Sequence, residues 1–241
     1  MSPRRNAFLL SVNTMSFLEQ LSPELTPKMV ELIAQSTLET IYMGIASTAI
    51  AILVGLPLGF LAFLSGQGRL LANRPLFAIL DAIINIGRSV PFIILLIVLL
   101  PVTRLLVGTT LGTTAAIVPL AIAAIPFFAR LTANALTEIP TGLTEAAKSM
   151  GASRWQVIYK YYLPECLPML INAGTLTLVS LIGYSAMAGV VGGGGLGSVA
   201  INYGEHRGMV VVKWIATIII VLIVMILQKL GDVLAQKVDH R

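Results

Sequence analysis

The side chains that could carry acid–base, nucleophilic or metal chemistry are few and scattered. The chain contains one cysteine, Cys166, and two histidines, His206 and His240. A lone cysteine excludes an internal disulfide, and histidines so far apart do not predict a metal centre. The sequence also lacks G-x-x-x-x-G-K-[ST], the loop that cradles ATP phosphates. We therefore expect this chain to have no catalytic residues and to bind no metal or cofactor itself.

A glycine-rich run, VVGGGGLGSVA, occupies residues 190–200. Gly192, Gly194 and Gly197 formally match the dinucleotide-binding pattern G-x-G-x-x-G. That pattern requires a preceding strand within a βαβ unit, and none is predicted here. We interpret the run as a tight, flexible re-entry or as a loop beside a gate.

One polar stripe interrupts an apolar segment. Asp81, Asn85 and Arg88 recur at i, i+4 and i+7, which places them on one face of a helix. Charges at membrane depth are costly and usually face a bundle interior or a cavity. Two interpretations remain. The stripe lies near a path through the bundle or near a helix–helix joint, or Asp81 lies at the membrane interface and Arg88 pairs with a polar group of another span.

A second polar region, EAAKSMGASRWQVIYKYYLP at residues 145–164, is predicted to form two short helices. Thr141 is a candidate N-cap for the first helix, and Gly151 is suited to end it. Ser153 and Gln156 predict a capping box at the start of the second helix, which we expect Pro164 to end.

The faces of these two helices differ in composition. Ala146 and Ala147 offer almost no side chain, so another surface could approach the first helix closely. Trp155, Ile158 and the Tyr161–Tyr162 pair recur at helical spacing on the second. Aromatic residues of this kind favour the membrane–water interface. We expect the first helix to face the aqueous phase and the second to lie against the bilayer.

Composition predicts an all-α membrane protein. Hydrophobic residues make up 56% of the 241, charged residues only 11%, and the mean hydropathy is +0.90. Soluble domains carry about 25% charged residues, so this chain cannot cover itself with polar surface. The net charge of +5 is typical of aqueous loops between spans rather than of nucleic-acid binding.

Five apolar segments are long enough to cross a bilayer core, which takes about 20 residues. We expect residues 1–39 to form an N-terminal extramembrane extension and residues 40–241 to form the transmembrane domain. The predicted spans are 42–64, 77–101, 105–129, 169–191 and 209–227.

Gly55 and Gly59 form a GxxxG pair in the first span, with Pro57 between them. Such a pair can mark a close helix–helix contact. Membrane helices also tolerate isolated Gly and Pro. We favour tolerance, because Pro57 would bend the face.

Basic residues set the expected orientation. Lys and Arg are more numerous on the side shared by residues 130–165 and the C-terminus. By the positive-inside rule, that side is expected to be cytoplasmic.

The spacing of the polar loop resembles a family signature. Glu145-Ala146-Ala147, Gly151 and Leu163-Pro164 match the loop of permease subunits from ATP-driven, binding-protein-dependent importers. The chain departs from the pattern at Tyr161, where the family usually has Ile, and this puts only a packing detail in doubt.

This resemblance implies a type I ABC importer permease-like fold with five transmembrane helices in a bacterial inner membrane. The loop at about 138–164 would carry a coupling helix, in which Glu145, Ala146, Ala147, Ser149 and Gly151, with Leu163 and Pro164, would couple to the ATPase. The expected partners are a second copy of the chain, two cytoplasmic ATPase subunits that use ATP and Mg²⁺, an extracytoplasmic binding protein and membrane lipid.

Two further stretches narrow the resemblance. NIGRSVPFIILL is similar to amino-acid importer permeases, and LVSLIGYSAMAGVVGGGGLG is similar to methionine importer permeases. The likeness implies methionine as substrate, with Tyr184 and Ser185 on the path and Met187 as a gate. Met187 could instead be core packing. The alternatives are a permease of the same class for another amino acid or small solute, and an ion-gradient-driven secondary transporter.

Overall fold

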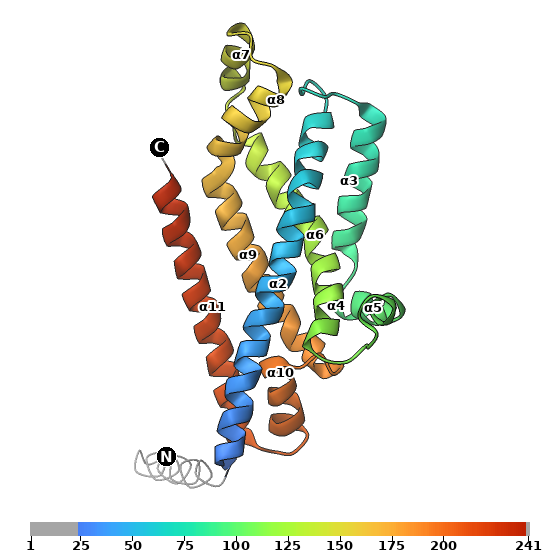
Figure 1. Cartoon of the computed structure of the whole chain (residues 1–241), viewed down its shortest axis with the longest axis vertical. Helices are drawn as coiled ribbons and strands as arrows, with labels where there is room; N and C mark the ends of the chain where they lie inside the picture. The colour runs from blue at the N-terminus through green and yellow to red at the C-terminus, as the bar shows by residue number, and fades with distance from the viewer. Residues whose placement is uncertain (1–23, 240–241) are drawn as a thin grey trace, which may run out of the picture.

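The computed structural model describes residues 24–239, and this part of the chain is an elongated bundle of helices (Figure 1). The helices, two of which are π-helical turns (η), are α2 (Pro27–Ser65), α3 (Arg74–Ser89), α4 (Phe92–Val98), α5 (Leu100–Val107), α6 (Thr113–Thr137), α7 (Thr141–Ser149), α8 (Arg154–Gln156), η1 (Val157–Tyr162), α9 (Leu163–Val190), α10 (Gly195–Val199), η2 (Ala200–Glu205) and α11 (Val210–Val238).

The all-helical membrane fold is confirmed. Within residues 24–239, four helical segments are long and apolar enough to span a bilayer, and the bent α3–α4 pair makes a fifth if it counts as one span. The four are α2, α6, the run that includes α9, and α11.

The second and third predicted spans differ from the observed helices. The second, at 77–101, is broken between Ser89 and Phe92, where α3 and α4 meet at 101°. Pro91 causes the break, because the residue before a proline is pushed out of the helical region, and Val90 is extended here. The third span begins at Thr113 rather than at residue 105. Gly108, at φ +83°, ends α5 in the left-handed conformation, and a loop separates it from α6.

The first span starts earlier than predicted. Thr26 caps α2, and its hydroxyl accepts the Met29 N–H. The helix then runs unbroken to Ser65, so residues 27–39 continue the first span as one helix. Residues 1–23 lie outside the described part, and the division of the chain near residue 39 stays a prediction.

The core of the bundle lies where α2, α4, α6 and α9 meet. Met43, Leu120, Phe128 and Leu181 belong to one buried apolar cluster there, each at most 1% exposed. The long helices thus hold α7 at one end of the molecule and α10 at the other (Figure 1).

The GxxxG pair of α2 is a close contact with α6, so our preference for mere tolerance was wrong. A Cβ on Gly55 would lie 2.8 Å from the Ile125 carbonyl oxygen, and one on Gly59 would lie 2.5 Å from that of Ala129. Pro57 lies inside α2 without interrupting it. Small residues let helix backbones approach in lipid, where association depends on packing.

This contact predicts a stability difference between two glycine substitutions. Gly59→Ala should lower the thermal unfolding midpoint of the detergent-purified protein, because α6 must move; overpacking of this kind costs about 1–3 kcal/mol. Gly183→Ala is the matched control, since a Cβ there meets nothing within 4 Å. Equal midpoints for the two variants would contradict the assigned contact.

Candidate functional site

The predicted coupling helix is α7, which lies at one end of the bundle beside α8 (Figure 1). It begins one residue earlier than expected. Thr141 is not its N-cap: Pro140 takes that position with an extended ψ of 133°, and no side chain caps the helix. Thr141 is instead the first helical residue.

Gly151 ends α7, as predicted. Its φ of +78° is left-handed, a conformation that a residue with a Cβ adopts only at a cost. The Ala152 N–H donates to the Ala147 carbonyl, and the Gly151 N–H donates to that of Lys148. These two bonds form a Schellman motif, which satisfies carbonyls at the helix end. The geometry fixes the angle at which the chain leaves α7.

The capping box of the second helix is also confirmed. The Gln156 N–H donates to Ser153 Oγ at 3.3 Å, and the Ser153 N–H donates to Gln156 Oε1 at 2.7 Å. Two backbone donors at the helix start are thereby satisfied.

Pro164 does not end this helix, contrary to prediction. The chain continues from α8 through η1 into α9. A proline clashes with the carbonyl four residues back in an α-helix. Here the helix widens just before it: the Leu163 N–H donates to the Ile158 carbonyl, five residues back. The π-turn accommodates Pro164, so the loop after α7 leads directly into a membrane span.

Ala147 faces the interior of the chain, so our expectation that it is open to another surface was wrong. It is 0% exposed and lies in an apolar cluster with Leu136, Val157 and Tyr162. The Thr144 hydroxyl and the Tyr162 hydroxyl share a hydrogen bond of 2.8 Å from the same side. This side of α7 therefore holds the helix to η1.

The outward side of α7 carries the remaining signature residues. Its second half exposes Glu145, Ala146, Lys148 and Ser149, and Met150 after it is exposed as well. Ser149 Oγ donates to the Glu145 backbone carbonyl within the helix. The Glu145 carboxylate forms no hydrogen bond or ion pair with another described residue. Ala146 is the small residue among these exposed side chains.

The aromatic residues after α7 divide between two environments. Trp155 is 78% exposed, whereas Tyr162 is buried and packs edge-on against Phe63 of α2. Tyr161, at the position where the family pattern departs, is half-buried against the cluster that contains Ala147. Tyrosine is therefore accommodated there without disturbing α7.

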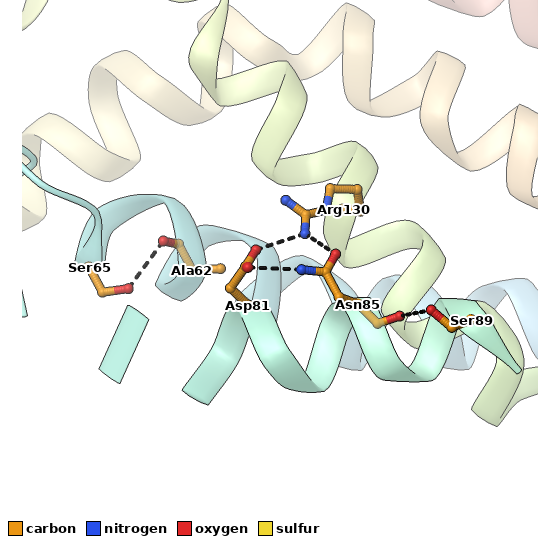
Figure 2. A network of polar contacts seen from close by, with 6 residues as sticks. All are labelled: Ala62, Ser65, Asp81, Asn85, Ser89 and Arg130. Atoms are coloured by element: carbon orange, nitrogen blue, oxygen red, sulfur yellow. Dashed lines mark hydrogen bonds and ion pairs between the residues drawn. The ribbon is translucent and has the colours of Figure 1, made fainter. Parts of the chain in front are cut away.

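Asp81 and Asn85 of the polar stripe bind Arg130 of α6 (Figure 2). Arg130 Nη2 lies 2.8 Å from Asp81 Oδ1, and the same nitrogen donates to Asn85 Oδ1. Asn85 Nδ2 donates to Asp81 Oδ2 at 2.8 Å. The three side chains join α3 to α6. Arg130 is the first residue of the segment 130–165 that we expected on the cytoplasmic side, and its pairing with Asp81 was not predicted.

Arg88 is separate from this network. It forms no hydrogen bond or ion pair with any residue between 24 and 239, and it lines a cavity of about 210 Å³. The cavity is bounded by Val90, Phe92, Ala123, Ala124, Phe127, Thr177, Ser180, Leu181 and Tyr184, together with Arg88 itself.

The three predicted path residues lie in different surroundings. Tyr184 lines the cavity, and its ring stacks on that of Phe92 at 4.9 Å. Ser185 is 2% exposed and donates to the Ile182 carbonyl, so its hydroxyl is used within α9. Met187 is 47% exposed on a single chain, which places it outside the core. Its role as a gate stays a prediction.

The glycine-rich run forms a tight turn that returns the chain onto α9. Gly192, Gly194 and Gly195 all have positive φ, between +74° and +85°. Gly189 and Gly197 leave no room for a Cβ, because α10 packs directly on the backbone of α9. The turn is thus held tightly in place.

Two residues of α2 hold the start of α10, and sequence analysis did not identify them as partners. The Gly195 N–H donates to Glu39 Oε2 at 2.8 Å, and the Leu196 N–H donates to Thr40 Oγ1 at 2.9 Å. Glu39 had been assigned to the extension. Its position next to the uncharged first span was the sequence feature that could have indicated a bound partner.

The observed features define a class: a multi-span helical membrane protein with an exposed, capped helix between two of its spans. The model of the family "Binding-protein-dependent transport system inner membrane component" matches residues 55–241. The match covers more than half of the chain, so the chain belongs to this family and is its membrane-spanning permease component.

The chain is similar over most of its length to two relatives. It is 72% identical over 217 residues to the "Probable D-methionine transport system permease protein MetI" of Pasteurella multocida, covering 90% of this chain and 100% of the relative. It is 66% identical over 209 residues to the protein of the same description from Haemophilus influenzae, covering 87% and 98%.

Solved structures show the same fold. An inward-facing structure of the MetNI methionine ABC transporter matches with a TM-score of 0.88 at 44% identity, over 90% of this chain and 100% of that chain. An amino acid ABC transporter with histidines matches with a TM-score of 0.72 over 87% and 95% of the two chains. At 18% identity, the second match concerns the fold alone.

The Asp81–Arg130 pair predicts a non-additive pattern of stability. Asp81→Asn and Arg130→Gln should each lower the thermal unfolding midpoint, since each leaves one charge unpaired at membrane depth; hydrogen bonds to charged groups contribute about 1.5–3 kcal/mol. The double variant should lose less than the sum of the two. Additive losses in this double-mutant cycle would show that the pair does not join α3 to α6.

Proposed function

We propose that this chain is the permease subunit of an ATP-driven methionine importer. It forms the path for methionine that an extracytoplasmic binding protein delivers. The observation that carries the proposal is the likeness of 90% and 87% of the chain to two D-methionine permeases, which extends through the coupling loop and the span after it. The fold match to a methionine ABC transporter supports the same conclusion.

The energy comes from a separate ATPase, which uses ATP and Mg²⁺. The outward side of α7, with Glu145, Ala146 and Ser149, is the surface offered to that subunit. Short helices that fit a groove on a partner are a recurring mode of recognition. Gly151 and the packing of Ala147 hold α7 rigidly to η1, so a displacement of α7 is passed to α9.

A pair of identical permeases completes the assembly, with one ATPase subunit for each. The five spans of one chain form half of a passage, and Arg88 and Met187 are exposed on the single chain. A charged side chain at membrane depth faces water or protein rather than lipid. Arg88 therefore faces water or protein, and we propose that Met187 borders the space between the two copies.

The C-terminus is cytoplasmic in this arrangement. The end of α11 lies at the same end of the bundle as α7, whereas α10 and the start of α2 lie at the other (Figure 1). The end that receives the ATPase is cytoplasmic, and the α10 end faces the binding protein. The basic residues near α7 agree with this orientation. The membrane is the bacterial inner membrane.

The alternatives are less well supported. A permease for another amino acid would share the fold and the coupling loop. Only the identity of the transported substrate distinguishes it from a methionine permease. An ion-gradient-driven carrier would need an available carboxylate in the membrane. Asp81, the candidate for that role, is bound to Arg130.

The experiment is ATP hydrolysis by the reconstituted permease–ATPase complex, stimulated by binding protein loaded with different ligands. L-methionine, D-methionine, oxidised methionine and small peptides form the panel. We expect methionine-loaded binding protein to stimulate hydrolysis several-fold. We also expect uptake into proteoliposomes to survive an ionophore and to stop without ATP. If binding protein loaded with another amino acid stimulates hydrolysis and methionine-loaded binding protein does not, methionine is not the substrate. If the ionophore abolishes uptake, transport is not driven by ATP.

A further inference from the structure

Arg88 is a charged side chain deep in the membrane with no partner in the described part of the chain. It lies fourteen residues beyond Arg74, the start of α3. At 1.5 Å per residue this is about 21 Å along the helix axis. The hydrocarbon core of a bilayer is about 30 Å thick. An intramembrane guanidinium without a counter-ion marks a cavity or a binding site rather than a lipid-facing surface.

The nearby acidic side chain cannot serve as its counter-ion. Asp81 is bound by Arg130 and Asn85, two turns away along α3 (Figure 2). Arg88 lines a cavity of about 210 Å³, far larger than the ~10–15 Å³ that one water needs, so its five N–H donors are available to a ligand in that cavity. A fixed, always charged fork of donors is suited to a carboxylate, which it can bind through two parallel hydrogen bonds.

The α9 wall of the cavity offers acceptors. The Thr177 hydroxyl donates its proton to the Ala173 carbonyl at 2.7 Å, and the Ser180 hydroxyl donates to that of Leu176 at 2.8 Å. Each oxygen therefore presents only lone pairs to the cavity. Such a pair of acceptors suits an ammonium group.

The remaining wall is apolar and aromatic. Phe92 and Tyr184 stack nearly parallel, at an interplanar angle of 7°, and Phe127 and Leu181 complete the lining. A thioether makes favourable contacts with aromatic rings. The Arg88 donors, the Thr177 and Ser180 acceptors and the apolar wall thus match the carboxylate, the ammonium group and the side chain of an apolar amino acid.

We propose that this cavity is a substrate-binding subsite within each permease chain. Arg88 binds the α-carboxylate, and the Thr177 and Ser180 oxygens accept from the α-ammonium group. The site deepens the proposed function and rests on it. With this subsite, the permease itself binds amino acids selectively after the binding protein has released its ligand.

The test measures equilibrium binding of radiolabelled L-methionine to the nucleotide-free permease–ATPase complex in nanodiscs, without binding protein. The competitors are D-methionine and two analogues of methionine, one without the carboxylate and one without the ammonium group. We expect the wild-type complex to bind methionine about 10- to 100-fold more tightly than the decarboxylated analogue.

The decisive variant is Arg88→Gln. It should weaken methionine binding to the level of the decarboxylated analogue while leaving the binding of that analogue unchanged. Arg88→Lys should retain part of the preference. Arg104→Gln is the matched control, because Arg104 is an exposed arginine of α5 that does not line this cavity, and it should bind like the wild type. Ser180→Ala should weaken the binding of methionine more than it weakens the binding of the analogue without the ammonium group.

Two results would overturn the subsite. One is a wild-type complex that does not discriminate between methionine and the decarboxylated analogue, or that shows no saturable binding of methionine. The other is an Arg88→Gln complex that loses affinity for both equally, which indicates a structural role. Uptake of methionine by wild-type proteoliposomes with binding protein is measured in parallel. Intact uptake with either result overturns the subsite alone. If the proteoliposomes take up another amino acid but not methionine, the proposed function is overturned. The role of Arg88 is then tested with that amino acid and its decarboxylated analogue.

Discussion

In the hydrocarbon of a bilayer, a polar group is stable only if it has a partner or faces water. This constraint accounts for the main polar features of the structure. Asp81, Asn85 and Arg130 satisfy one another and so join α3 to α6. Glu39 and Thr40 satisfy the backbone of α10 at the opposite end. Arg88 has no hydrogen-bond or ion-pair partner between residues 24 and 239, and the cavity that it lines is where we propose that a ligand binds.

Helix continuity connects the two ends of the molecule. The Ser153 capping box starts a helical run that passes through the π-turn at Val157–Tyr162 and continues as α9 to Val190. α7 is fixed to the start of this run through Ala147 and Tyr162. Thr177, Ser180 and Tyr184 lie further along it. In the proposed assembly, a movement of α7 on the ATPase would reach the cavity through one continuous element, which can bias a two-state path.

Local signals in the sequence predicted the features that depend on local chemistry. Composition predicted the membrane class, and the residues around Gly151 and Ser153 predicted where α7 ends and α8 begins, because left-handed backbone and capping hydrogen bonds are decided within a few residues. The features that sequence analysis missed depend on distant segments. The inward side of Ala147 is set by η1, and the closeness of Gly59 to Ala129 is set by the docking of α6. No local pattern shows that Arg130 faces Asp81.

The central claim is that the outward side of α7 docks on the ATPase while Ala147 faces the permease. Maleimide labelling of single cysteines, in a Cys166→Ser background and in membranes with or without the ATPase, tests it directly. We predict that Ala146→Cys is labelled in the permease alone and protected when the ATPase is present, and that Ala147→Cys is unlabelled in both. Equal labelling of Ala146→Cys with and without the ATPase would contradict the account.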